Sequence, residues 1–251
     1  MLKLRNILLI GASLLFLATI VYANEGISGK VVNAAEPSIV LSAKYQTMLN
    51  EVSGNINKGK IAEVTATLNK IDYYLTRQMT NKKVQYLSFA DAEEYQAFLN
   101  EFTPSQTVVW CDKGWEKELY YREYLLSDAK LFDQALVKIN AALLVAPYAS
   151  ELYCEKGYCL ANLKKTNDAL AAYNQAIDLA DRFASEAHNK AWALRGRGYQ
   201  LIDLGQIEEA KAAYNESLGL DPNNKTALDE LDYIKGLQAP APASGNEEQN
   251  K

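Results

Sequence analysis

The sequence has few of the residues on which enzymes and metal sites most often depend. Its 251 residues include one histidine, His188, and three cysteines. There is no Cys-x-x-Cys or His-x-x-x-His spacing, no glycine-rich phosphate loop and no Gly-x-Ser-x-Gly motif. We therefore expect a non-catalytic protein with no metal site and no cofactor.

The three cysteines, Cys111, Cys154 and Cys159, are an odd number, so at least one has no intramolecular partner. Cys154 and Cys159 are five residues apart on one predicted helix, and their side chains therefore point in different directions. We expect three buried thiols, with an intermolecular bridge as the alternative.

One apolar run of about 15 residues, Ile7–Val21, lies near the N-terminus behind Lys3 and Arg5 and leads into Val-Tyr-Ala. A charged start, an apolar run of this length and small residues after it are typical of a secretory signal peptide. We expect residues 1–23 to be cleaved off after Ala23, which makes the mature protein periplasmic or secreted. An uncleaved anchor is the alternative, and we expect membrane contact only in that case.

Basic residues are in the minority. Without Lys3 and Arg5 the chain has 24 basic and 31 acidic residues, a net charge of −7. This excess of acidic residues argues against nucleic acid as a partner. The composition of residues 238–251 is typical of a disordered tail, and residues 24–38 are expected to be a flexible mature N-terminus.

An internal repeat organises the second half of the chain. Leu119–Pro147, Tyr153–Asp181 and Leu194–Pro222 align with one another, and their matching alanines are 34 and 41 residues apart. Four positions recur, a leucine, an alanine, a large residue and a second small residue: Leu126, Leu160 and Leu201; Ala135, Ala169 and Ala210; Ile139, Tyr173 and Tyr214; Ala142, Ala176 and Ser217. Gly157 and Gly198 precede two of the leucines, and we expect them to face Ala169 and Ala210 at close helix crossings.

This pattern with a period of 34 residues resembles the tetratricopeptide repeat. The resemblance implies an all-α fold, an α-α superhelical solenoid of helical hairpins, with three repeats over residues 115–237 and a C-terminal capping helix at Asn224–Leu237. Seven additional residues around Arg182–His188 are expected to lengthen a helix or its connection. The chain departs from the family pattern at a glycine, a proline and three leucine positions, which hold Glu123, Asp181, Arg122, Lys156 and Arg197.

The region before the repeats, residues 39–110, is predicted to be helical. Residues 58–64 echo residues 204–210, which indicates a degenerate repeat-like hairpin over Val40–Leu75. A short amphipathic helix is expected at Asp91–Glu101. Because no partner strand is apparent for the apolar run Val108–Trp110, we expect it to be an extended segment against the first repeat.

In the tetratricopeptide family the first helix of each repeat lines a concave groove, and the resemblance assigns ligand-facing positions by register. One of these positions is tyrosine in all three copies, so its rings either form a ladder for an extended peptide or wedge between repeats. The lysine and asparagine pairs with which some repeat proteins clamp a C-terminal carboxylate are absent. The assigned positions hold Lys117, Tyr120, Tyr124 and Asp128; Glu151, Cys154, Tyr158 and Asn162; and Trp192, Arg195, Tyr199 and Asp203.

The sequence thus favours an interaction scaffold or adaptor outside the cytoplasm that binds a protein or peptide partner in its groove. Two alternatives stay open: an enzyme or enzyme subunit with a site in residues 39–110, and a purely structural envelope component. A polar cleft with a perturbed acid in that region favours the enzyme, whereas a hairpin packed on the first repeat favours the adaptor.

Overall fold

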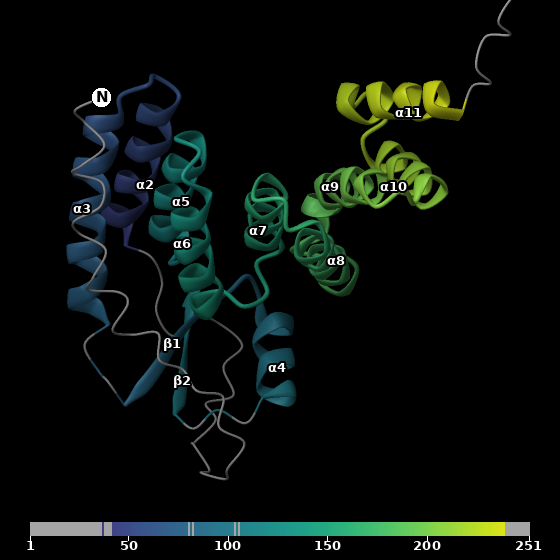
Figure 1. The fold of residues 1–251 in the computed structure, drawn as a ribbon. Helices are drawn as coiled ribbons and strands as arrows, with labels where there is room; N and C mark the ends of the chain where they lie inside the picture. The colour runs from purple at the N-terminus through teal and green to yellow at the C-terminus, as the bar shows by residue number, and fades with distance from the viewer. Residues whose placement is uncertain are drawn as a thin grey trace, which may run out of the picture.

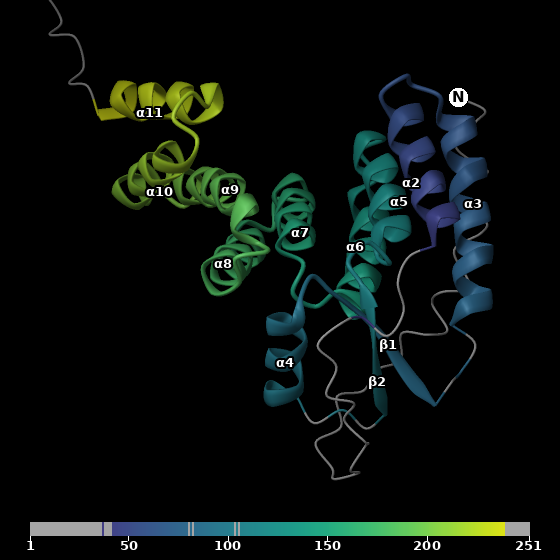
Figure 2. The same ribbon diagram turned by 180° about the vertical axis from the view of Figure 1, so that it is seen from behind.

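The computed structural model describes residue 37 and residues 42–238, apart from 80, 82, 103 and 105. The expected signal peptide, the tail from residue 239 and the expected flexible N-terminus, except Pro37, lie outside the described residues. The described helices follow one another in a curved row, with a small sheet and one further helix below it (Figures 1 and 2). The helical solenoid predicted from the sequence is confirmed.

Three helical hairpins form the repeats, and each helix packs on the next along the chain. One hairpin cannot bury its own apolar face, so stacking of neighbours supplies the core. A last helix packs on the third hairpin at the position predicted for the cap. The helices are α5 (Lys117–Asp128) and α6 (Phe132–Val145), α7 (Ser150–Asn162) and α8 (Thr166–Arg182), α9 (Lys190–Asp203) and α10 (Ile207–Leu220), and the capping helix α11 (Lys225–Gln238).

A left-handed residue follows the first helix of each hairpin. Lys130, Lys164 and Gly205 have φ angles of 59°, 60° and 74°. The upstream hairpin, α2 (Ala43–Ile56) and α3 (Ile61–Gln78), turns in the same way through Gly59, with φ of 67°. Both of its helices contact α5. The echo between residues 58–64 and 204–210 therefore corresponds to one shared turn, and the hairpin extends the row of repeats.

The glycines of the repeats contact tyrosine rings. A Cβ placed on Gly157 or Gly196 would lie 2.7 Å and 2.2 Å from the nearest ring atoms of Tyr173, and one on Gly198 would lie 2.8 Å from the ring of Tyr214. The expectation that glycine faces alanine is corrected accordingly. Tyr173 and Tyr214 lie one turn after Ala169 and Ala210, on the same face of the second helix. Their longer side chains are therefore the nearest atoms to the glycines at the helix crossing.

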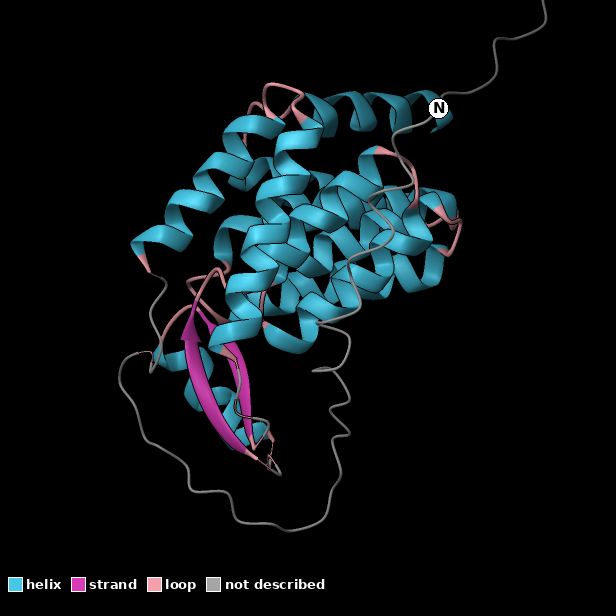
Figure 3. Cartoon of the chain, turned by 90° about the vertical axis from the view of Figure 1, so that its left-hand side faces the viewer, coloured by secondary structure: helices cyan, strands magenta, loops and turns pink. Residues whose placement is uncertain are grey.

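A two-stranded parallel sheet lies beside the repeats (Figure 3). Its strands are β1 (Val84–Phe89) and β2 (Thr107–Asp112), connected by α4 (Ala92–Glu101). The prediction of an unpaired extended segment at Val108–Trp110 was wrong, because β1 pairs with it. The predicted helix at Asp91–Glu101 is confirmed, and the Asp91 side chain caps it by accepting from the backbone N–H groups of its first turn.

Aromatic side chains join the sheet to the repeats. The indole of Trp110 donates a hydrogen bond to the Phe89 carbonyl at 3.1 Å, and both residues are buried. Tyr148, from the turn after α6, packs on Phe89 and on Phe183, with ring centroids 6.2 and 5.0 Å apart. Phe183 belongs to the additional residues, which form the connection from α8 to α9 and include the 3₁₀ turn η2 (Ala187–Asn189).

A buried ion pair stands at one of the positions where the family usually has leucine. Arg122 pairs with Glu118 one turn earlier on α5, and both side chains are almost fully buried. The guanidinium also donates to Asn69 Oδ1 on α3 at 3.1 Å, so the pair connects the upstream hairpin to the first repeat. The three cysteines are all buried and unbridged, as predicted. None of the helices in the described residues has the length and apolar content to cross a membrane.

Candidate functional site

Three tyrosines occupy the same register on the first helices of the hairpins. Tyr124, Tyr158 and Tyr199 are 41%, 44% and 48% exposed. The leucines two residues further along, at positions 126, 160 and 201, are buried, because residues two apart on a helix point in different directions. Each ring is thus partly open to solvent, and that of Tyr158 also lies edge-on to the ring of Phe132 on α6, in the preceding repeat, with centroids 6.0 Å apart. We call these three residues the tyrosine ladder.

The first helix also carries Lys117 and Tyr120, both half-buried. The Lys117 ammonium forms an ion pair with Glu151 of α7 and lies 4.5 Å from the centroid of the Tyr120 ring. Burial raises the pKa of Tyr120, and the nearby carboxylates of Glu151 and Glu155 raise it further. These contacts hold Lys117 within the array.

Two positions assigned to the groove in the third repeat are also bound within the array. Arg195 donates to Ser217 Oγ at 3.2 Å and lies 3.6 Å from Asp221, so the interpretation of Arg195 as an exposed groove cation is corrected. Trp192 is half-buried and packs against the cluster that contains Cys154, which is itself fully buried and cannot face a ligand. Contacts with residues outside the first helix therefore reduce the solvent exposure of Arg195 and Trp192.

The last assigned positions lie near the C-terminal ends of the first helices. Asp128, Asn162 and Asp203 are exposed. The Asn162 amide donates to the Tyr158 carbonyl of its own helix at 2.9 Å. Together with the tyrosine ladder, these residues leave an aromatic and mainly acidic surface open to solvent.

Further carboxylates lie between α5 and α7. Burial, together with the nearby carboxylates of Glu123 and Glu151, raises the pKa of Glu155 to about 8. Glu123 is fully buried, accepts a hydrogen bond from the Ser127 hydroxyl at 2.6 Å, and has a pKa raised by burial to about 7. In the described residues, no group of three or more His, Cys, Asp or Glu is arranged to hold a metal ion.

The family described as "Tetratricopeptide repeat" matches residues 150–182 and 190–224, which are the second and third hairpins. This chain therefore contains two tetratricopeptide repeats. Its first hairpin has the same left-handed turn but lies outside the matched residues, and it is the hairpin in which Glu123 replaces the family's glycine.

Two of the solved structures that are similar to this chain are the following. "MamA 41-end from Desulfovibrio magneticus RS-1" has a TM-score of 0.51 at 14% identity, over 78% of this chain and 86% of that chain. "First TPR of Spaghetti (RPAP3) bound to HSP90 peptide SRMEEVD" has a TM-score of 0.45 at 26% identity, over 50% and 94% of the two chains. No curated protein matches this chain in sequence. The likeness to the MamA structure shows the fold alone.

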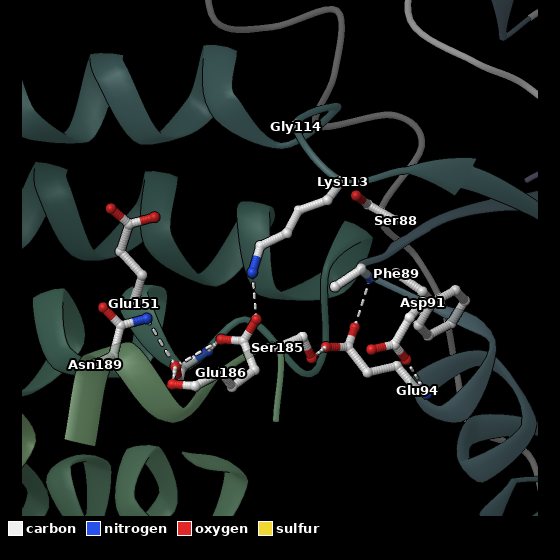
Figure 4. Close-up of polar contacts among 12 residues, drawn as sticks. Ser88, Phe89, Asp91, Glu94, Lys113, Gly114, Glu151, Ser185, Glu186 and Asn189 are labelled. Carbon is white, nitrogen blue, oxygen red and sulfur yellow. Dashed lines mark hydrogen bonds and ion pairs between the residues drawn. The ribbon is translucent and has the colours of Figure 1, made fainter. Parts of the chain in front are cut away.

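The additional residues between the second and third repeats bind the sheet to the array (Figure 4). Glu186 is fully buried and accepts hydrogen bonds from the backbone N–H and the hydroxyl of Ser150, at 2.7 and 2.6 Å. It also pairs with Lys113, which follows β2. Asn189 donates to Ser150 Oγ at 2.9 Å. We call this set of four residues the Glu186 joint.

Glu94 of α4 lies on the sheet side of the joint. Its carboxylate accepts from the Ala90 backbone N–H and from the Ser185 hydroxyl, both at 2.7 Å (Figure 4). Burial raises its pKa to about 7 although both hydrogen bonds lower it. Its two partners belong to the loop before α4 and to the additional residues, which makes Glu94 a structural group.

The sequence indicated the tyrosine ladder but missed the Glu186 joint and the burial of Glu123. Only one signal pointed to Glu123, a charged residue at a position where the family pattern has glycine. Nothing in the local sequence indicates that Glu186, in a predicted connection, lies in the interior.

Proposed function

We propose that this protein is a non-catalytic interaction scaffold that acts outside the cytoplasm and holds an extended segment of a partner protein along the first helices of its repeats. The observation that carries the proposal is the tyrosine ladder, three rings in one register that are each close to half exposed. Solenoid repeats present extended binding surfaces of this kind, and tyrosine supplies rigid contact area with a polar end.

The groove chemistry selects the kind of segment that binds. Asp128 and Asp203 are exposed near the ladder, and Glu155 is half-buried among other carboxylates. A segment that places basic residues near these carboxylates and apolar residues against the rings complements this surface. The packing of the upstream hairpin on α5 supports a binding role over an enzyme site in residues 39–110, and the perturbed acid of that region, Glu94, is buried with both oxygens hydrogen-bonded.

Truncation of the ladder tests the proposal. Tyr158→Ala and Tyr199→Ala should each weaken partner binding by roughly 1–3 kcal/mol, as loss of an aromatic anchor does, with a small effect on thermal stability. The partner is first isolated by affinity capture with the full chain from the native envelope fraction, and each variant is then titrated against it.

Two tyrosine variants serve as controls. Tyr233→Ala removes a surface ring of α11 that is 54% exposed and should leave affinity unchanged. Tyr173→Ala removes a buried ring and should cost about 3–5 kcal/mol of stability. Unchanged partner affinity in both ladder variants would exclude this groove as the binding site.

The proposed location rests on the first 23 residues, which have the order of charge and apolar length typical of a signal peptide. Intact mass of the protein from the envelope and culture fractions should correspond to a chain that begins at Asn24. A species that keeps Lys3 and Arg5 in the membrane fraction would show an uncleaved anchor instead.

A further inference from the structure

A second surface, separate from the tyrosine ladder, lies on the upstream hairpin. A half-open groove of about 680 Å³ runs along α2 and α3, and we call it the basic groove. The hairpin lies at the end of the row opposite α11 (Figure 1). Residues that line the groove include Lys44 and Met48 of α2, and Asn69, Lys70, Tyr73 and Arg77 of α3; no acidic residue does.

Three cations without a carboxylate partner face this groove. Lys44, Lys70 and Arg77 are exposed, and none of them forms an ion pair with another residue of the described chain. This local surplus of positive charge stands in a protein whose net charge is −5. Like charges that converge on one groove repel each other, so an anionic ligand is stabilised there.

The groove also offers an ordered aromatic surface. Tyr73 is 63% exposed, and the Arg77 guanidinium lies 5.4 Å from its ring centroid and donates to its hydroxyl at 2.6 Å. These contacts hold the two side chains together before any ligand binds. Asn69 Oδ1 accepts from Arg122, which connects the floor of the groove to the first repeat.

The spacing of the cations along α3 defines the ligand. Lys70 and Arg77 are seven residues apart, which places them on one face and roughly 10 Å apart along the helix, with Tyr73 between them. A peptide in the polyproline II form rises about 3.1 Å per residue with three residues per turn, so two acidic side chains three positions apart lie on one side, about 9 Å apart, and reach both cations. A residue between them lies against the Tyr73 ring and Met48.

We propose that the basic groove binds an acidic, extended segment of a partner protein, whose two carboxylates pair with Lys70 and Arg77 while Lys44 contributes a third positive charge. This site does not depend on the tyrosine ladder, whose surface is acidic. The net negative charge of the chain repels a long polyanion, so a short acidic peptide is favoured over nucleic acid.

Fluorescence polarisation with labelled nonapeptides tests the proposal on the full chain. The peptides carry two glutamates, with a phenylalanine between them, in a glycine–serine background, and the glutamate spacing changes in steps of one residue. Binding should be tightest at a spacing of three, should weaken at high salt, and should be lost when both glutamates are glutamine. Equal binding of the glutamine peptides, or no binding of any acidic peptide, overturns the proposal.

Variants assign the binding to the groove. Lys70→Gln and Arg77→Gln should each weaken the best peptide about tenfold, as loss of a contacting charge does, with unchanged thermal melts because both side chains are exposed. Lys58→Gln, in the turn of the same hairpin, is the matched control and should bind normally, as should Tyr158→Ala. Retained affinity in both groove variants contradicts the assignment. If the groove binds an oligothymidine or phosphatidylglycerol vesicles but none of the peptides, its ligand is a nucleic acid or an anionic membrane and the proposed acidic peptide is wrong.

Discussion

Tyrosine has two different roles in this chain, and the helix on which it lies decides between them. Tyr173 and Tyr214 are on second helices and are buried against glycines of neighbouring first helices. The ladder tyrosines are on first helices and face solvent. The same side chain therefore fills the core in one register and offers a binding surface in the other.

Glu123 shows how a single departure from the family pattern changes the core. A glycine at this position would leave no charge to bury, whereas the Glu123 carboxyl is fully buried and depends on Ser127 and Cys159 for hydrogen bonds. Its second oxygen, Oε2, is buried without a hydrogen-bond partner in the described structure. Ionisation of this carboxyl is therefore costly in the folded state.

We predict that Glu123 makes stability fall as pH rises. Its pKa is about 7 in the folded protein against a usual value near 4.5, so between these pH values the folded state holds a proton that the unfolded state has lost. The free energy of unfolding should fall across this window and level off above it. Glu123→Gln should reduce the decline, to which the raised pKa values of Glu94 and Glu155 also contribute, and should be relatively more stable at pH 8 than at pH 4, by up to about 3 kcal/mol. Urea titrations at both pH values measure this, and a difference that does not vary with pH would contradict it.

At the scale of elements, the second and third repeats are joined at a close crossing in which one ring fills the space left by two glycines. The ring of Tyr173 lies against Gly157 of α7 and Gly196 of α9, so it belongs to two successive repeats. This shared contact is one physical form of the coupling between neighbours in a solenoid.

A methyl group at this crossing should destabilise the array. Gly196→Ala places a Cβ 2.2 Å from the Tyr173 ring, which forces the ring to move and should cost roughly 1–3 kcal/mol. Gly219→Ala, in α10 with no atom within 4 Å, is the matched control and should be neutral or stabilising by up to about 1 kcal/mol, because alanine favours the helix. Thermal melts compare them. If both variants behave alike, the crossing is looser than described.

At the scale of the whole molecule, an aromatic cluster and buried polar contacts connect the sheet to the solenoid. The sheet with α4 and the second and third repeats meet at the aromatic cluster and at the Glu186 joint. The additional residues between the second and third repeats supply both Phe183 and Glu186. An insertion that only lengthens a connection in the sequence thus attaches the sheet to the solenoid.

Breaking the Glu186 joint should loosen the sheet before the repeats. Glu186→Gln removes a buried charge that pairs with the partly exposed Lys113 and accepts from Ser150, and this loss should cost about 1–3 kcal/mol. Hydrogen exchange should accelerate in β2 and α4 more than in α9 and α10. Asp229→Asn, which breaks the exposed pair with Lys225, should leave exchange unchanged. Equal acceleration in all elements would show that Glu186 supports the solenoid as a whole.

The sequence by itself determined the repeats and most of their helices. The 34-residue spacing of Ala135 and Ala169, the helical periodicity and the cap residue Asp91 are local features, and local spacing is enough to define hairpins. It also determined that the ladder positions share a register, because register follows from counting residues along aligned helices.

Only the tertiary structure decided which elements meet. The pairing of β1 with β2, the burial of Glu123 and Glu186, and the ion pair that withdraws Arg195 from the groove all join segments from different elements. A polar side chain is buried when its neighbours satisfy it and is exposed when they do not, and those neighbours are separated in sequence by tens of residues. The local periodicity of the sequence does not indicate which distant residues become neighbours. The repeat pattern therefore predicted the fold, but it did not predict which polar side chains are buried and which are exposed.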